Sequence, residues 1–332
     1  LMFGVGLHFS FSDLIKFSKI SVPGAVFQIV SVTAIGGLAL KLWGFEWAEG
    51  LIYGLALSVA STIVLLRAFE ERGEVDTEHG KIAVGWLIVE DILMVLALVL
   101  IPVIADLSAS KEPVTAAVIG TQTLTVAVKI GIFMVLMYYL GRKLLPWLLV
   151  SIARTRSAEL ITLGTLAIAL GFAFIAYTMF DASFALGAFL AGLVLGDSEI
   201  GNRAADKSLP MRDAFAVLFF VSVGMLFDPM TLVERPFMVA ATLAIIIIVK
   251  LLVTLAVARL FKVRWVESVP IAISLTQIGE FSFILAGISV ANNLMSQEIY
   301  GLILAGALLS IALNPFLFKV FDRYKERLVA AG

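Results

Sequence analysis

Two acidic residues, Glu90 and Asp91, stand side by side within an apolar stretch that runs from Ile82 to Asp106. An acid at the centre of a membrane-spanning helix costs about 2.5–3.5 kcal/mol on insertion scales, so acids are found there when they bind something. Their chemistry suits protons and cations, which a carboxylate takes up in turn. The pair therefore predicts an intramembrane site for protons or cations.

Two further charged residues are candidates for the same site. Lys250 lies in the apolar run 245–252, where an ammonium group needs a carboxylate partner or must lose its proton, and Glu90 is the candidate partner. The alternative is that Lys250 extends to the membrane surface, but about ten apolar residues on each side make that reach long. Glu280 is open to three interpretations: an ion ligand, a salt-bridge partner or a helix-positioning residue.

Two polar strings resemble each other, residues 56–62 and residues 272–278. An odd number of predicted spans separates them, so they run in opposite directions, as inverted repeats with broken helices do. Small hydroxyl residues and Gly279 allow the backbone to unwind and leave carbonyl and hydroxyl groups for an ion. Taken alone, each string is more typical of close helix packing, but together with Glu90 and Asp91 the ion-binding interpretation is favoured.

Composition favours the membrane. Of the 332 residues, 61% are apolar and only 15% are charged, with a mean hydropathy of +1.05. Soluble domains carry about 25% charge. The formal net charge of -1, without a basic patch, disfavours nucleic-acid binding. The absence of cysteine excludes disulfides, cysteine-bound zinc and a cysteine nucleophile.

The elements that must position these residues are apolar runs long enough to cross about 30 Å of hydrocarbon. Eight such runs and two shorter ones, ten predicted spans in all, lie near 22–43, 49–66, 82–106, 118–141, 157–178, 182–196, 213–227, 236–260, 268–290 and 298–320. The first nine residues read as the tail of a further helix, so the sequence looks truncated at its start. No signal peptide is recognised. Residues 1–328 are predicted to form one membrane domain.

The basic residues test this count. When loops alternate between the two sides, 19 of the 24 Lys and Arg residues fall on one side, and Lys41, Lys111 and Arg235 fall on the other. Lys129 and Lys250 lie inside apolar runs. Such asymmetry is what the positive-inside rule predicts, and it indicates a cytoplasmic C-terminus.

Six strings together resemble one family of transporters. They are Phe3-Gly4-Val5-Gly6-Leu7, Ala60-Ser61-Thr62, Val89-Glu90-Asp91, the segment 183–192, the segment 219–225 and Gln277-Ile278-Gly279-Glu280-Phe281. In this order they are similar to the Kef and YbaL-type members of the second monovalent cation:proton antiporter family.

The resemblance implies an all-α polytopic fold of thirteen helices in inverted repeats, with two crossed, unwound helices. It implies a homodimer in a prokaryotic inner membrane that exchanges K⁺ or Na⁺ for H⁺, with no other cofactor. Compared with that plan, about two and a half N-terminal helices are missing. So is the cytosolic nucleotide-binding regulatory domain that often follows Tyr324. A regulatory domain or ancillary subunit is therefore a possible partner.

The resemblance also assigns roles to single residues. Asp91 matches the acid that carries the cation or the proton, and Lys250 matches the lysine that pairs with its neighbour. Glu90 matches a variable position where Kef-type potassium systems have Gln. Three residues lie on the segments that resemble the crossed helices: Ser61, Thr62 and Gln277. Glu280 is grouped with Lys250 as a salt-bridge or switch residue.

Competition at one oxygen cluster gives the mechanism. A charged Asp91 holds a monovalent cation, a protonated Asp91 is neutral, and an empty charged site is costly to move through the barrier. K⁺ is favoured over Na⁺ by the Kef resemblance. The alternative is a proton-independent, channel-like K⁺ efflux pathway. An intramembrane aspartyl protease is a weaker alternative, because adjacent acids point about 100° apart on one helix.

Overall fold

The computed structural model describes residues 2–7, 11–109, 116–180, 184–196, 201, 211, 214–215, 217–218, 221–222 and 224–331, and within these residues the regular elements are all helices. In chain order they are α1 (Met2–Leu7), α2 (Phe11–Leu42), α3 (Trp47–Ser58), α4 (Thr62–Arg72), α5 (Glu78–Ala109), α6 (Ala116–Leu136), η1 (Met137–Gly141), α7 (Arg142–Ala153), α8 (Ala158–Phe180), α9 (Phe184–Gly196), α11 (Met230–Glu234), α12 (Pro236–Ala244), η2 (Ile245–Val249), α13 (Lys250–Leu260), α14 (Trp265–Leu275), α15 (Glu280–Ala291) and α16 (Gln297–Ala331). The prediction of an all-α polytopic fold is confirmed.

Seven helical stretches in the described part of the chain are long and apolar enough to cross a membrane: Lys16–Leu42, Trp47–Arg72, Gly131–Ala153, Glu159–Phe180, Pro236–Leu260, Trp265–Ala291 and Gln297–Lys325. Helix α5 covers the predicted run 82–106, and the predicted run 182–196 contains the shorter apolar helix Gly187–Gly196. The run 213–227 falls partly outside the described residues. The total of ten spans and the single membrane domain stay predictions.

The chain forms two compact units, the first made of Leu1–Leu14 with Val95–Val221 and the second of Ile15–Met94 with Ser222–Gly332. In the first unit, α1 packs closely against α9. Gly6 lies against the main chain of Phe189 and Leu193, and Gly192 lies against Phe3, so neither position has room for a Cβ atom. The Phe3–Leu7 string of the sequence is thus a helix fixed by backbone contact.

Helix continues without a break from α6 through the π-helical turn η1 into α7. The predicted span 118–141 ends before Arg142 and Lys143, which were therefore counted with the loops, but both begin α7, so that expectation was wrong. Charge asymmetry reports the side of the membrane and not the backbone conformation, so a basic helix and a basic loop give the same signal. The Arg142 guanidinium lies 4.8 Å from the centre of the Tyr138 ring.

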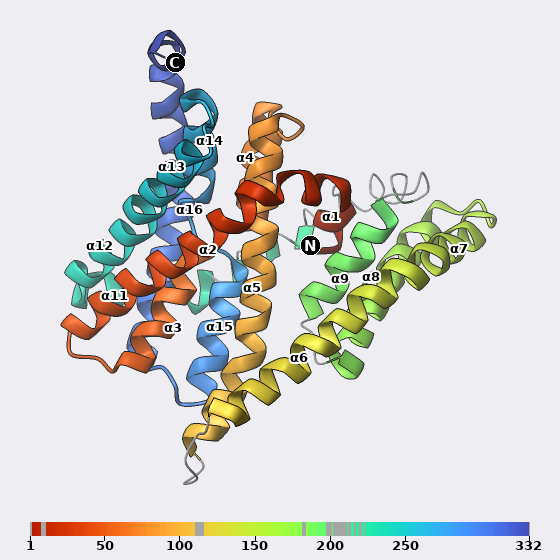
Figure 1. Cartoon of the computed structure of the whole chain (residues 1–332), viewed down its shortest axis with the longest axis horizontal. Helices are drawn as coiled ribbons and strands as arrows, with labels where there is room; N and C mark the ends of the chain where they lie inside the picture. Colours follow the sequence, from red (N-terminus) through yellow and green to blue (C-terminus); the bar gives the residue numbers. More distant parts are fainter. Residues whose placement is uncertain are drawn as a thin grey trace. The chain divides into compact units, whose positions relative to one another are not determined.

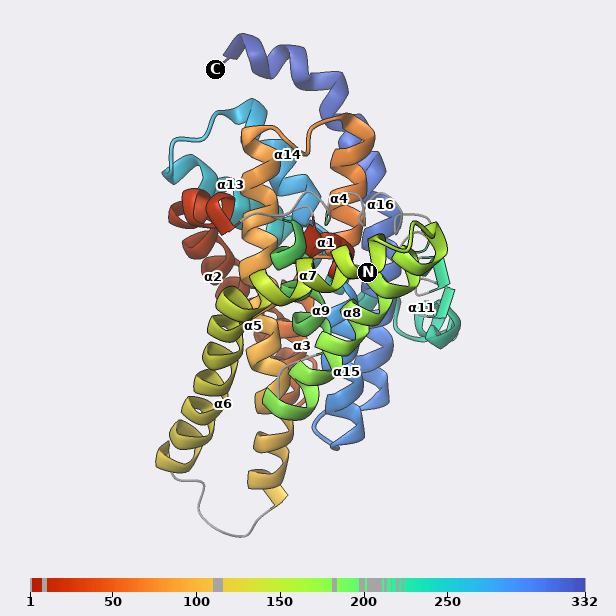
Figure 2. The ribbon, with the colours of Figure 1, turned by 90° about the vertical axis from the view of Figure 1, so that its right-hand side faces the viewer.

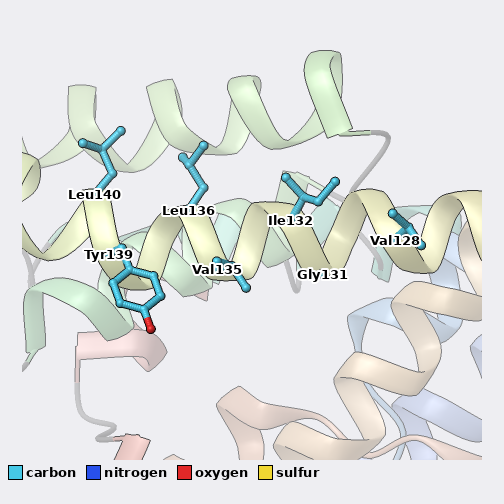
Figure 3. A pocket seen from close by; sticks show the side chains of 7 residues that line it. All are labelled: Val128, Gly131, Ile132, Val135, Leu136, Tyr139 and Leu140. Carbon is cyan, nitrogen blue, oxygen red and sulfur yellow. The ribbon is translucent and has the colours of Figure 1, made fainter.

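One face of α6 and η1 lines an open groove of about 680 Å³ (Figure 3). Its lining is apolar apart from one phenol: Val128, Gly131, Ile132, Val135, Leu136, Tyr139 and Leu140. Such a stripe is typical of a helix that faces lipid hydrocarbon. This face carries no acid or base and is not a candidate for ion chemistry.

The second unit contains two broken helices. Helix α3 stops at Ser58 and α4 starts at Thr62, while α14 stops at Leu275 and α15 starts at Glu280. In Figure 1 the chain rises from α3 to α4 but descends from α14 to α15, and Figure 2 shows the same opposite directions from the side. The predicted inverted arrangement of two unwound helices is therefore confirmed.

An apolar cluster with a charged rim joins α4 to α14 and α16. Ile273, Phe318 and Phe321 form its buried part. At its edge, Arg72 donates two hydrogen bonds of 2.8 and 2.9 Å to the Asp322 carboxylate and one of 3.1 Å to Glu74. A bidentate arginine–carboxylate pair fixes orientation as well as distance, so the end of α4 is tied to α16.

Candidate functional site

The first helix break is three residues long, from Val59 to Ser61, and its backbone is extended (φ -93°, ψ 132° at Val59; φ -82°, ψ 120° at Ser61). Ser61 acts as the N-cap of α4, because its hydroxyl accepts a hydrogen bond of 3.4 Å from the Val64 N–H. Serine competes well for this position, so the local sequence favours a new helix start here. The break leaves backbone groups free to bind side chains.

The second break, residues 276–279, is stabilised at its carbonyl end. Thr276 donates through Oγ1 to the Ile273 carbonyl at 2.7 Å, and the Asn314 amide donates to the same oxygen at 2.7 Å. Both side chains are buried. Carbonyls at a helix end need such donors inside a membrane, where water does not supply them.

The two breaks cross at Gly279. A Cβ atom there would lie 2.6 Å from the Ser61 Cα and 2.9 Å from the Ala60 carbonyl oxygen, so only glycine fits. The fully buried Gln277 side chain binds the other break: its Oε1 accepts from the Ser61 N–H at 2.9 Å, and its Nε2 donates to the Ser61 carbonyl at 3.1 Å. The predicted crossing of the two unwound segments is thus a direct contact.

Asp91 lies on α5 beside the start of α4. Its Oδ2 accepts a hydrogen bond of 3.1 Å from the Thr62 hydroxyl. Its Oδ1 is buried and has no hydrogen-bond partner among the described residues. The N-terminus of α4, which begins at Thr62, adds a partial positive charge beside the acid. Asp91 therefore offers an unused acceptor oxygen beside the start of α4.

Glu90, the neighbouring acid, is fully buried and has both oxygens engaged. Oε1 accepts from the Gln28 side-chain amide, and Oε2 accepts from the Ala60 N–H at 2.9 Å. Glu90 thus accepts a hydrogen bond from the backbone of the first helix break. Asp91, about 100° further round α5, keeps one oxygen without a hydrogen bond. The two adjacent acids have different surroundings.

Lys250 is fully buried and begins α13 directly after the π-helical turn η2. Its ammonium donates to the Gln277 carbonyl at 2.8 Å, at the second break. The predicted partner, Glu90, interacts with Lys250 electrostatically, but no ion pair within 4.0 Å joins these two described residues. A cation at the carboxyl end of α14 is stabilised by the helix dipole as well.

Glu280 is the first residue of α15 and is nearly buried. Its carboxyl interacts with the Ser61 hydroxyl and lies in electrostatic range of Asp91. An acid at a helix N-terminus is stabilised by the dipole. The position is compatible with each of the three interpretations given to this residue from sequence.

All seven sequence-predicted site residues belong to the second unit, and the structure brings them to the two breaks. In the described part of the chain, no group of three or more His, Cys, Asp or Glu side chains forms a metal centre. The Thr62 hydroxyl is bonded to Asp91, the carboxylates of Glu90 and Glu280 lie in electrostatic range, and the first break ends at the residue before Thr62. Hard oxygen donors of this kind suit an alkali cation or a proton.

Three buried polar residues of the site were missed by the sequence analysis: Gln28, Thr254 and Asn314. Gln28 bridges Glu90, the Ser58 carbonyl and Thr254. Each is a polar side chain in the middle of an apolar run, which is the signal that led to Lys250. A single uncharged amide or hydroxyl is a weaker signal than a charge, because it costs less to bury.

Known proteins resemble the whole chain. The putative cation/proton antiporter YbaL of Escherichia coli is 51% identical over 98% of this chain, and the K(+) efflux antiporter 4 of Arabidopsis thaliana is 30% identical over 96% of it. An uncharacterized protein in the phaC 3' region of Methylorubrum extorquens is 51% identical over 61% of the chain. The chain spans 58% and 53% of the first two relatives. Residues 1–321 match the family described as "Sodium/hydrogen exchanger, transmembrane", and the chain therefore belongs to that family of membrane transporters.

Proposed function

We propose that this chain is the membrane domain of an antiporter that exchanges a monovalent cation, K⁺ in preference to Na⁺, for H⁺ at Asp91. The observation that carries the proposal is the buried Oδ1 of Asp91, which has no hydrogen-bond partner among the described residues and lies where two broken helices meet. The names of the two relatives, a putative cation/proton antiporter and a K(+) efflux antiporter, support the choice of ions.

Exchange follows from one oxygen cluster serving two ligands. Asp91 in its charged form binds a partly dehydrated cation together with the hydroxyls of Thr62 and Ser61. Asp91 in its protonated form is neutral and needs no cation. An empty charged site would have to cross a low-dielectric barrier with an uncompensated charge, which costs several kcal/mol or more. That cost couples cation movement to proton movement.

The remaining site residues hold this cluster in shape. Gln277 and Gly279 fix the crossing of the two breaks. Lys250 donates a hydrogen bond to the Gln277 carbonyl just after α14, and its positive charge interacts with the negative charge of Glu90. Lys250 and Glu280 are the groups whose charges change the field at Asp91 when the site is loaded or emptied. We assign them the switch role on that basis.

The resemblance to the Kef and YbaL-type antiporters supports a homodimer in a prokaryotic inner membrane. It also supports a cytoplasmic C-terminus and a cytosolic regulatory domain or ancillary subunit as partner. The 19-to-3 distribution of Lys and Arg supports the orientation. The lipid bilayer itself is indicated by the seven apolar helices.

Purified protein in proteoliposomes tests the proposal. With K⁺ inside and none outside, the wild type acidifies the lumen, because K⁺ leaves in exchange for H⁺. Asp91→Asn, which is nearly isosteric, abolishes this acidification while it keeps a monodisperse elution profile. Glu71→Gln is the matched control, since this acid is highly exposed and pairs only with Arg67.

Two results contradict the proposal. One is K⁺-driven acidification by Asp91→Asn at the rate of the wild type. The other is a voltage-driven K⁺ current through the wild type that is independent of pH, which identifies a channel-like pathway. Repeating the assay with Na⁺ in place of K⁺ tests the preferred cation.

A further inference from the structure

Gln28 of α2 makes three hydrogen bonds in the interior of the second unit. Its Nε2 donates both to Glu90 Oε1 and to the Ser58 carbonyl, the latter at 3.2 Å, and its Oε1 accepts from the Thr254 hydroxyl at 2.8 Å. The side chain is fully buried, as is Thr254. Both protons and the oxygen of the amide are therefore used, which fixes its orientation.

Two acceptors, Glu90 Oε1 and the Ser58 carbonyl, decide which end of the amide faces Glu90, and the Thr254 hydroxyl bonds the other end. A hydroxyl that donates to Oε1 places Nε2 on the opposite side, toward the acid and the first helix break. Rotation of the amide by 180° would set Oε1 against the Glu90 carboxylate and leave two buried groups unpaired. The orientation is thus fixed by acceptors on α3 and α5, and a residue on α13 supplies the donor for the buried Oε1.

Gln28 and Ala60 together saturate Glu90. Each carboxylate oxygen accepts an N–H donor, from α2 and from the first helix break, and Lys250 on α13 adds a positive charge nearby. Burial disfavours the charged form of Glu90, and these donated hydrogen bonds together with the charge of Lys250 oppose burial and favour it. Asp91 on the same helix has no second donor, and the only further acid in its range besides Glu90 is Glu280 among the described groups that act on it.

We propose that Gln28 is a positioning residue that keeps Glu90 out of proton exchange, so that the transporter moves one proton per cation. This inference rests on the proposed antiport at Asp91 and adds its stoichiometry. In this proposal Glu90 keeps its charge through the transport cycle, and the loaded site is either Asp91 with a cation or Asp91 with a proton. Both states carry the same net charge, so one cation leaves as one proton enters and no charge crosses the membrane.

Loss of Gln28 changes that balance. Without its amide, Glu90 keeps only the Ala60 donor and takes a proton when Asp91 does. Two protons then enter for each cation that leaves, and one positive charge moves inward per cycle. A merely structural role for Gln28 would lower the rate of exchange without making it electrogenic.

The test measures proton flux and current on the same proteoliposomes, with a pH-sensitive dye and with electrodes on a solid-supported membrane. After a K⁺ jump, the wild type shows dye-detected exchange and no current above protein-free liposomes. Gln28→Leu shows exchange that carries a current of one charge per cation. Thr254→Val, which leaves the buried Oε1 of Gln28 without its donor and so loosens the amide, gives a current of the same sign, and Thr254→Ser restores the electroneutral behaviour.

Ser289→Ala is the matched control, because this buried hydroxyl bonds only within its own helix, to the Leu285 carbonyl. It is expected to stay electroneutral. If Gln28→Leu does not fold, Thr254→Val decides the matter alone.

The outcomes distinguish a failure of the proposed antiport function from a failure of the role given to Gln28. Absence of any K⁺-dependent proton flux in the wild type overturns the proposed function. Proton flux accompanied by current in the wild type, or active variants of Gln28 and Thr254 that remain electroneutral, overturn only the role given to Gln28.

Discussion

Gln277 is bonded to Ser61 as one β-strand residue is bonded to another: its side-chain amide accepts from the Ser61 N–H at 2.9 Å and donates to the Ser61 carbonyl at 3.1 Å. A third bond of 3.0 Å runs from Nε2 to the Ser274 carbonyl. One side chain thus satisfies backbone groups from both broken helices. In a membrane interior, where unpaired backbone groups are costly, this is a strong local constraint.

Replacing this amide tests its structural weight. Gln277→Met has a similar shape but leaves the N–H and carbonyl of Ser61 and the Ser274 carbonyl without this partner. A buried unpaired group costs about 1–3 kcal/mol, so the unfolding temperature in detergent is expected to fall strongly. Transport is expected to fall with it. Gln297→Met, at an exposed position in the first turn of α16, is the control and should change neither quantity. A stable, active Gln277→Met protein would contradict this account.

The backbone contact at Gly279 gives a second prediction. Gly279→Ala adds one methyl group that has no space beside Ser61 and Ala60, so the breaks must move apart. We expect at least a tenfold loss of exchange and a lower unfolding temperature. The loss should appear in the proteoliposome assay and in a thermal melt followed by tryptophan fluorescence.

Gly287→Ala is a matched control in α15, the helix that begins directly after Gly279. Nothing lies within 4 Å of the Cβ atom it introduces, and alanine is favoured over glycine in a helix interior by about 1 kcal/mol. It is expected to be neutral or slightly stabilising. Equal effects of the two substitutions would show that the contact with Ser61 is unimportant.

The charged rim around Glu74 makes stability depend on acid pH. Burial alone would raise the pKa of the Glu74 carboxyl, but hydrogen bonds and charges from Arg72 and His79 outweigh burial and hold the pKa below its ordinary value. Such a carboxyl stabilises the folded state above its ordinary pKa of about 4.3 and loses this contribution as the pH falls through the lowered value. Glu74→Gln should therefore lower the unfolding temperature at pH 7.

The difference between wild type and Glu74→Gln should shrink as the pH falls below about 4. Thermal melts in detergent between pH 3 and pH 8 measure it. Glu71→Gln, which removes one member of an exposed pair with Arg67, is expected to have almost no effect at any pH. A constant difference between wild type and Glu74→Gln across the whole range would argue against the charged rim as its cause.

Local sequence signals were enough to predict the two adjacent acids and the two helix breaks of the second unit. Glu90 and Asp91 were found because charges in apolar runs are costly. The two breaks were found because Ser61 and Gly279 are residues that end or start helices, set in unusually polar strings. These signals depend on a few neighbouring residues, so a single sequence contains them.

Partnerships between distant residues could not be predicted in the same way. Lys250 was expected to contact Glu90, but its hydrogen bond goes to the Gln277 carbonyl, because the second break brings a bare carbonyl within reach. Gln28 is separated from Glu90 by 62 positions, and no local pattern connects them. Such contacts depend on helix packing, which the order of apolar runs leaves open.

The π-helical turn η2 has a consequence for where the buried lysine points. A π turn accommodates one residue more than an α-helical turn, so the chain before Lys250 is out of phase with the chain after it. If the same residues wound as a regular α-helix, the ammonium would point about 100° further round the axis, whereas deleting one isoleucine from 245–248 would remove the π turn and leave the direction of the ammonium unchanged. The direction of this charge is therefore set by the winding of the turn that precedes it.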